Sequence, residues 1–562
     1  MKVAFIHFHL KPGGVTRVIQ QQISICEQMG WDYCVLAGEN PLDIPNVLTL
    51  SELHYDLHRS GLGEGNPAAV LAGRIHSAIS HFFRCHESGN GKEAGEPDTT
   101  SRPGNPDPAV GRETSDNAEN SENAEDSGNT EYTHSCADVI HVHNPTLAKN
   151  SDLLPALNIL KQQGHPLFFQ IHDFAEDGRP TVYSSATYPA DVHYGCINSR
   201  DAEYLEKAGL QTERLHLLPN LVSPLPGAPE PGAPLPPAPG RQNARGSGRD
   251  RTRRFALYPV RGIRRKNLGE ILLLSLLYDD LDFGITLEPN NPADMPSYRF
   301  WESLAHELDA PVYFNTAKHQ QFEQALAKAD FFITTSVQEG FGFTFLEPWT
   351  LGKPVAGRKI PYVHKDFTES GMIMDHFYDE IPVPVSMVDF ELFRQEWLAE
   401  TSRRLSRFRI ALRNQELDKG AARTQEITGT LGNRFHELYA SASHVDFARL
   451  DRENQASVIR TLAASPEQRE QLLSQVPLLQ GCPFTGCLEQ MNPIISRNHG
   501  MVYQTYGEDQ YAQRLEGIYQ VVMQDANAAV PAAPEPKSTV LDKEQLLFSF
   551  LDPSQVFLVA SL

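Results

Sequence analysis

Two glutamates on either side of a tight Gly-Phe-Gly turn, in residues 334–354, are the most informative pair of side chains in the sequence. Glu339 precedes the turn and Glu347 follows it, with seven residues between them. An apolar run at residues 331–333 ends just before this stretch, and an apolar helical pattern follows the turn. The free amides of such a turn and helix start attract an anion, while the carboxylates accept hydrogen bonds from sugar hydroxyls. The stretch is therefore suited to hold a phosphate and a polyol together.

Two cations, Arg261 and Lys266, follow a predicted strand at residues 255–259. Together they can neutralise the charge that grows on a diphosphate leaving group, a task that a divalent metal performs in other sites. A solvated basic loop is the alternative, and it is the more common explanation when such a pair stands alone.

His172 directly follows a predicted strand at residues 167–171, and Gly13 and Gly14 follow the predicted first strand. The histidine can donate to a sugar hydroxyl or act near a reacting centre, although an isolated strand-end histidine is more often satisfied by backbone. The two glycines can present amides to a phosphate. A dinucleotide fingerprint, G-x-G-x-x-G, is absent, and a plain strand–helix turn is the more common origin of such a pair.

All of these side chains lie just past the end of a predicted strand, where parallel α/β sheets bind ligands. Strands and helices alternate along both halves of the chain, and a segment rich in Pro, Gly and Ala, residues 223–248, separates the halves. We therefore predict an α/β fold of two doubly wound, Rossmann-like domains that face one another across a cleft, with an additional helical C-terminal region. The predicted strands cover residues 2–9, 32–37, 139–143, 167–171, 192–197, 215–218, 255–259, 283–287, 312–314 and 331–334. The predicted helices cover residues 15–29, 200–208, 268–277, 296–308, 319–328, 392–430, 451–473 and 508–524.

Composition divides the chain into consecutive parts. We predict an N-terminal Rossmann-like acceptor domain at residues 1–222 and a Pro/Gly/Arg linker at 223–252. A C-terminal Rossmann-like donor domain with a helical extension follows at 253–505. A helix that crosses back to the first domain is predicted at 506–525, and a linker with a short tail at 526–562. Within the first domain, residues 87–134 are acidic and almost free of large apolar side chains, which predicts disorder.

The balance of charge limits the partners that this chain is expected to bind. Its 562 residues carry a formal net charge of −22, which disfavours nucleic acid and anionic membrane surfaces. No apolar run is long enough to span a bilayer, and the apolar start lacks a small-residue cleavage site, so we predict a cytoplasmic protein without an integral membrane segment. Seven scattered cysteines indicate no disulfide framework. Two H-x-H pairs lie inside apolar strands without the further spacing of a zinc site, so we expect no metal and no cofactor, and the oligomeric state stays open.

Several short motifs resemble the GT-B glycosyltransferases of family 4, retaining enzymes that use nucleotide-activated sugars. The motifs are PGGVTRVI at residues 12–19, VIHVHNP at 139–145, IHD at 171–173, LLPN at 217–220, an Arg and a Lys-Asn separated by four residues at 261–267, and EGFGFTFLEPWTLGKPV at 339–355. The last motif is the most specific, because it carries the family's pair of glutamates with seven residues between them. A further stretch, residues 506–522, is similar to the helix by which such chains cross back to the first domain.

The resemblance implies a role for each matching residue. Arg261 and Lys266 would clamp the donor diphosphate, Glu339 would bind the donor sugar, and His172 would sit beside the reacting carbon. Glu347 would bind the ribose hydroxyls. The remaining donor-binding residues would contribute backbone amides: Gly13, Gly14, Gly340, Phe341, Gly342 and Phe343. No metal is required by this scheme.

We therefore expect a retaining, metal-independent hexosyltransferase whose co-substrate is a nucleoside-diphosphate sugar and whose acceptor is a soluble polyol, organic acid or saccharide. A non-catalytic scaffold on the same frame, or a GT-B phosphorylase or epimerase, is the alternative. Pro348 departs from the alanine usual in this family, and we expect the first helical turn to tolerate it.

Overall fold

The computed structural model describes residues 1–56, 66–87, 137–184, 186–230, 233, 235, 253–319, 322–413, 431–486, 488–527 and 540–560. The acidic stretch predicted at 87–134 lies, beyond Glu87, outside the described residues, and so does the basic end of the linker at 236–252.

The first half of the chain forms a seven-stranded parallel sheet with the order β3-β2-β1-β4-β5-β6-β7. The order reverses between β1 and β4, and at such a switch point the turns after neighbouring strands diverge and leave room for a ligand. The sheet's strands are β1 (Lys2–His7), β2 (Asp32–Ala37), β3 (Val47–Thr49), β4 (Val139–His143), β5 (Leu167–Ile171), β6 (His193–Cys196) and β7 (Leu215–Leu217). Its helices are α1 (Gly14–Gln28), α2 (Pro67–Glu87), α3 (Leu153–Gln162) and α4 (Ser199–Lys207).

The second half forms a five-stranded parallel sheet with the order β10-β9-β8-β11-β12. Here the order reverses between β8 and β11. The strands are β8 (Arg254–Arg261), β9 (Leu281–Leu287), β10 (Val312–Tyr313), β11 (Phe331–Thr334) and β12 (Val355–Gly357). The helices are α5 (Leu268–Leu277), α6 (Met295–Glu307), α7 (Thr316–His319), α8 (Phe322–Lys328), α9 (Phe343–Thr350) and α10 (Pro361–Glu369). The prediction of two doubly wound α/β units is confirmed.

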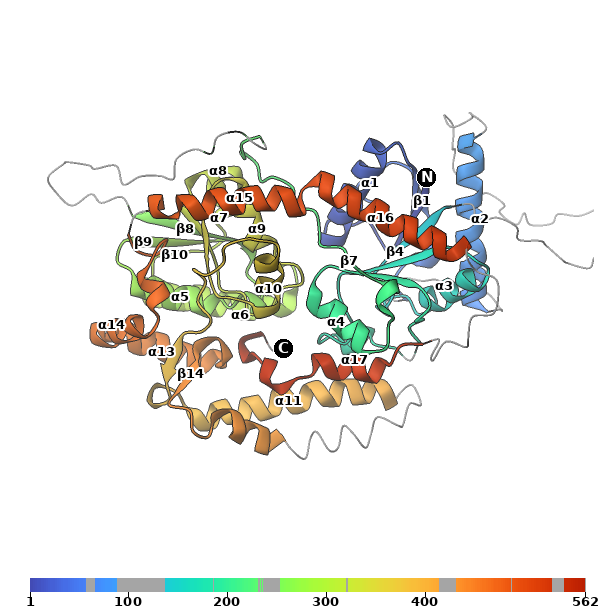
Figure 1. The fold of residues 1–562 in the computed structure, drawn as a ribbon. Helices are drawn as coiled ribbons and strands as arrows, with labels where there is room; N and C mark the ends of the chain where they lie inside the picture. Colours follow the sequence, from blue (N-terminus) through green and yellow to red (C-terminus); the bar gives the residue numbers. More distant parts are fainter. Residues whose placement is uncertain are drawn as a thin grey trace, which may run out of the picture.

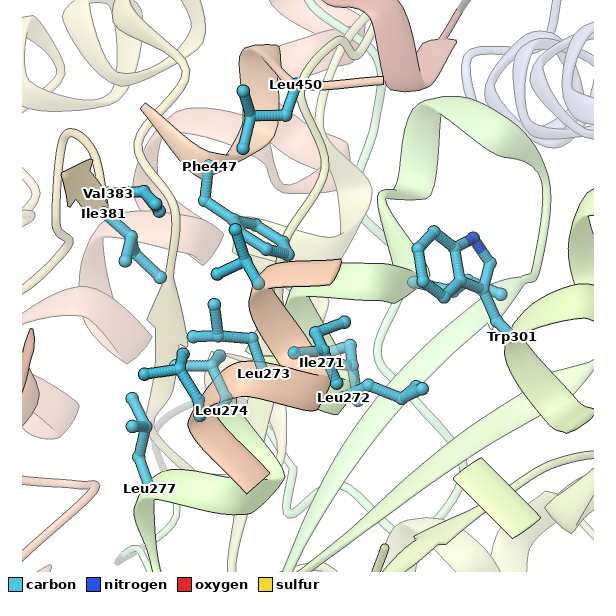
Figure 2. Close-up of a cluster of buried hydrophobic side chains, with 14 of the residues drawn as sticks. Ile271, Leu272, Leu273, Leu274, Leu277, Trp301, Ile381, Val383, Phe447 and Leu450 are labelled. Atoms are coloured by element: carbon cyan, nitrogen blue, oxygen red, sulfur yellow. The ribbon is translucent and has the colours of Figure 1, made fainter. Parts of the chain in front are cut away.

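Each sheet is covered by apolar side chains on both faces. The strands β4 and β5 are buried along their whole length, in agreement with their mainly apolar sequences. Helix α5 is buried on nearly all sides, because the helical region that follows the second sheet packs over it. Figure 2 shows Ile271, Leu272 and Leu273 of α5 among Trp301 of α6 and Phe447 of the later segment.

The helical region after the second sheet differs in detail from its prediction. A helix expected at residues 451–473 is two helices, α13 (Arg452–Ala464) and α14 (Pro466–Gln475), because Ser465 leaves the helical conformation and Pro466 starts a new helix. The helix expected from residue 392 is α11 (Phe390–Arg413), and the later part of that prediction, residues 414–430, lies outside the described residues. Strand β13 (Pro382–Pro384), before α11, pairs with strand β14 (His444–Asp446), before α13, as a two-stranded antiparallel sheet.

Two further segments cross between the sheets (Figure 1). Helix α15 (Asn492–Tyr506) packs beside the second sheet, and α16 (Glu508–Asn527) continues over the first, where Tyr511, Leu515, Ile518, Tyr519 and Val522 are buried as one face. On the opposite side, α17 (Lys543–Phe550) packs against the first sheet's core, while Val556 and Leu558 join the core of the second. The segment at 540–560 is thus packed against both halves.

Candidate active site

The first turn of α4 and the loop before α9 bring the two halves into direct contact. Asn198 donates from Nδ2 to the carbonyl oxygen of Gly340 at 2.9 Å, and the Ser199 amide donates to Asp366 Oδ2 at 2.9 Å. Gln338 Nε2 donates to Asp177 Oδ1 at 2.9 Å. The loop that carries Glu339 is therefore held by the first half of the chain as well as by the second.

A pocket opens beside this contact, with walls from both halves. Most of its lining residues are polar or charged, and the full set is His172, Asp173, Phe174, Asp177, Arg179, Arg200, Asp201, Arg265, Gln338, Glu339 and Gly340. Three residues predicted from sequence, His172, Glu339 and Gly340, meet here. Since they come from the ends of β5 and β11, the topology of the two sheets brings them together.

Lys266 and Glu339 form a buried ion pair at the side of this pocket. Nζ of Lys266 donates to Oε1 of Glu339, and the two residues are 8% and 7% exposed. Burial lowers the pKa of Lys266 against the opposing effect of Glu339. For Glu339, burial acts to raise the pKa, but the charges of Lys266 and Arg265 outweigh it and the pKa is lowered. Glu339 is therefore an ionised hydrogen-bond acceptor at pH 7.

Arg261 takes no part in this ion pair. Its guanidinium is exposed and donates to Asn290 Oδ1 at 2.6 Å. The two cations that the sequence places five positions apart thus have different partners in the structure: Arg261 ends β8, and Lys266 ends the short 3-10 turn that follows.

Glu347 contacts the opposite half of the chain. Its Oε1 accepts from Nη1 of Arg17 at 3.0 Å, and Arg17 also lies over the ring of Phe343. Burial raises the pKa of Glu347, with the Arg17 charge acting against it. Because Arg17 is on α1, which starts at Gly14, this ion pair joins the predicted glycine turn to the predicted glutamate motif.

The glycines of the predicted donor site differ in what fixes them. At Gly14 no atom lies within 4 Å of where a Cβ would be, so packing does not require glycine there. At Gly342 φ is 96°, and a Cβ would lie 2.9 Å from Val363, so glycine is required by the turn itself. Gly342 caps α9, whose first residue is Phe343. Pro348 is consequently inside α9, beyond the first turn that the sequence indicated.

His172 lies at the end of a ladder of buried histidines. Its Nε2 is 3.0 Å from Nδ1 of His143, and the two rings stack at 5.3 Å. His141 stacks in turn on His143 at 4.5 Å. Burial lowers the pKa of His172 to about 4, so this ring is neutral at pH 7. Asn144, with φ of 51°, accepts the backbone amide of His172 at 2.7 Å and fixes the strand end.

Sequence reasoning did not single out several residues of the site. Arg17 lies inside the motif at residues 12–19 but was not separately assigned, and Arg265 stands between two positions that were. Asp177 follows strand β5, and Arg200 lies in the first turn of α4. Both stand among ordinary polar residues, so neither carries a local signal. Their place depends on how the two halves dock.

Two doubly wound sheets facing one another across such a pocket, with the chain crossing back through α15 and α16, constitute the GT-B fold. No family model matches the sequence. The mannosylglucosyl-3-phosphoglycerate synthase of Petrotoga mobilis is 28% identical over 277 residues, which are 47% of this chain and 54% of that protein. The match therefore spans about half the length of that relative.

Solved glycosyltransferase structures align along much of the chain at low identity. One from Rickettsia africae has 10% identity, a TM-score of 0.46, and coverage of 93% of this chain and 98% of its own. HepE of Anabaena, in complex with UDP and glucose, has 13% identity, a TM-score of 0.38, and coverage of 84% and 98%. The galactosyltransferase WaaB, in its apo form, has 16% identity, a TM-score of 0.37, and coverage of 67% and 86%. The assignment of the fold depends on the two sheets of this chain and not on these likenesses.

Within the part of the chain that the structure describes, none of the helices combines the length and the apolar character needed to cross a membrane.

Proposed function

We propose that the chain is a retaining glycosyltransferase that moves a hexosyl unit from a nucleoside-diphosphate sugar to a hydroxyl group of a soluble acceptor. The observation that carries the proposal is the convergence of His172, Glu339 and Gly340 on one pocket between the two halves, with Lys266 ion-paired to Glu339. The match to a synthase of a glycosylated phosphoglycerate supports the same class of reaction.

In this proposal each polar group has a task that its surroundings allow. Ionised Glu339 accepts hydrogen bonds from the donor sugar's hydroxyls. Neutral His172 donates a hydrogen bond beside the reacting carbon and, with a pKa of about 4, does not serve as a proton source at pH 7. Lys266 stabilises negative charge on the leaving diphosphate, and Arg261 joins it by exchanging its bond to Asn290 for a phosphate oxygen.

The transfer itself forms a bond from the acceptor oxygen to the anomeric carbon and breaks the bond from that carbon to the phosphate oxygen. The acceptor's proton passes to the departing phosphate on the same face of the sugar, which retains the configuration. Positive side chains stabilise the leaving group, so this scheme needs no metal. The first acceptors to test are sugar acids and phosphorylated organic acids, because the relative's product is a glycosylated 3-phosphoglycerate by its name.

The test combines nucleotide binding with turnover. Purified protein is mixed with UDP-, GDP- and ADP-sugars and a panel of sugar acids, phosphorylated organic acids, polyols, organic acids and saccharides. Released nucleotide and the anomeric configuration of the product are measured. We expect one nucleotide to raise the melting temperature and one donor to be consumed. Absence of nucleotide binding and of release from every donor would refute the proposal, whereas phosphate-dependent cleavage without nucleotide would indicate a phosphorylase.

The role given to Glu347 needs a separate variant. Glu347→Ala should weaken nucleotide binding, because a ribose hydroxyl loses its acceptor. Arg17→Met removes the cation that holds Glu347 in this structure while leaving the carboxylate in place. An unchanged nucleotide affinity in Glu347→Ala would show that the ribose binds elsewhere.

A further inference from the structure

Three arginines line the pocket between the two halves, and two of them already have carboxylate partners. Arg179 donates from Nη2 to Asp173 Oδ1 at 2.6 Å. Arg200 donates to Asp201 Oδ1 at 2.7 Å. Because each guanidinium is matched by a carboxylate from the same half of the chain, neither provides a free positive charge for a ligand.

The third arginine, Arg265, is different. Among the described residues, no hydrogen bond or ion pair joins its side chain to another group, and its Nε is buried without an acceptor. Glu339, the carboxylate on which the charge of Arg265 acts, is paired with Lys266. Arg265 is nevertheless close to both, since its charge lowers the pKa of each of them.

The backbone fixes where this unmatched guanidinium stands. Arg265 is the middle residue of a short 3-10 turn, and its carbonyl oxygen accepts the amide of Val337 at 3.0 Å, which ties the turn to the loop that carries Glu339. A buried N–H without a partner is unfavourable, and the cost is removed when a ligand supplies an oxygen. A planar guanidinium matches the geometry of a phosphate group, which accepts two N–H bonds at once.

We propose that Arg265 binds phosphate oxygens of a substrate in this pocket and is a specificity-determining residue. The inference rests on the proposed function, since it assigns a binding role within the same site. Two sources of phosphate reach this position: the diphosphate of the donor, from the side of Lys266, and a phosphate carried by the acceptor, from the side of His172 and Arg179. Both sources present the same chemistry to the guanidinium.

Two variants and a matched control separate these sources. Arg265→Met removes the charge and keeps most of the side-chain length, and Arg265→Lys keeps the charge but loses the planar fork. Arg299→Met removes an exposed arginine of α6 outside the pocket lining and serves as the control. Circular dichroism and thermal melting establish that each variant is folded.

Calorimetric titration with pyrophosphate and with glycerol 3-phosphate measures binding independently of turnover. We expect Arg265→Met to weaken one of the two probes about tenfold or more, in keeping with the loss of a hydrogen bond to a charged group, and Arg265→Lys to fall between wild type and Arg265→Met. Loss of pyrophosphate binding with a raised KM for the donor assigns the donor diphosphate. Loss of glycerol 3-phosphate binding with a raised KM for a phosphorylated acceptor alone assigns the acceptor.

The outcomes distinguish this inference from the proposed function. If wild type binds either probe and Arg265→Met binds both as tightly as wild type, the inference is overturned whether or not sugar is transferred. If wild type binds neither probe, the inference is overturned as well. If wild type releases no nucleotide from any donor but loses a probe on Arg265→Met, the proposed function fails and the phosphate site stands.

Discussion

The buried pair of Lys266 and Glu339 permits a quantitative test of how the site is held together. Lys266→Met keeps the aliphatic volume but leaves the Glu339 carboxylate, which is 7% exposed, without the cation that it contacts. Such a carboxylate either stays ionised in a poorly solvated place or takes up a proton. The cost of leaving that carboxylate unpaired in the variant therefore cannot exceed the free energy of protonating it at the working pH.

This upper limit on the cost falls as the pH falls, because protonating the carboxyl becomes easier. With an unfolded-state pKa of about 4.3, protonation requires about 3.7 kcal/mol at pH 7 and about 1 kcal/mol at pH 5. In wild type the pKa of Glu339 is lowered, so its contribution to stability is present above the unfolded pKa and is lost as pH falls. In Lys266→Met, burial is opposed only by the charge of Arg265, so the pKa of Glu339 rises relative to wild type and the variant loses stability above the unfolded pKa. Both effects make the difference between the two proteins shrink on acidification.

Urea unfolding of wild type, Lys266→Met, Glu339→Gln and the double variant at pH 7 and pH 5 measures these terms. We expect Lys266→Met to lose up to about 4 kcal/mol at pH 7 and about 1 kcal/mol at pH 5. The double variant should recover much of the lost stability, since neither charge is then buried alone, but it should not recover nucleotide binding. A loss that is equal at both pH values, or a double variant as unstable as the sum of the single variants, would refute this account.

Three further outcomes follow from other contacts. Arg17→Met should change the free energy of unfolding by no more than about 1 kcal/mol, because the Arg17 side chain that pairs with Glu347 is half-exposed. A larger change in urea unfolding would mean that the ion pair holds the two halves together. Gly357→Ala should prevent accumulation of folded protein, because φ is 139° and a Cβ would collide with the backbone of β11. Gly517→Ala, on an open face of α16, should instead stabilise the protein by about 0.5–1 kcal/mol. Equal melting temperatures of these two variants would contradict this reasoning. Phe550→Ala should destabilise by about 2 kcal/mol, less than a fully buried phenylalanine, since its half-buried ring packs between the first half's aromatic rings and Arg200; wild-type stability would show that the segment at 540–560 is only loosely attached.

Local patterns in the sequence were enough to predict most strands of the two parallel sheets. The strands β2, β4, β5 and β11 and the helix α5 begin and end where the apolar runs do, because turn-forming or charged residues stop each run. Helices α2, α3, α10 and α15 were not predicted. In α3 a proline interrupts the apolar pattern, and in α15 polar residues are interleaved with the buried ones, so neither shows the regular spacing that marks α16.

The sequence by itself also determined which candidate residues meet. His172 and Glu339 each follow a buried parallel strand, and parallel strands release their C-terminal ends at one edge of a sheet, so two such sheets facing one another must bring these residues toward a shared space. The partners of those residues were decided only by tertiary structure. Arg17 lies 330 positions from Glu347, and Gln338 lies 161 positions from Asp177. No local period encodes such pairings, because they depend on the rigid-body placement of one sheet against the other. The same is true of Arg265: nothing in its local sequence marks it, and the turn after β8 places its charge close enough to Glu339 to lower the pKa of that carboxyl.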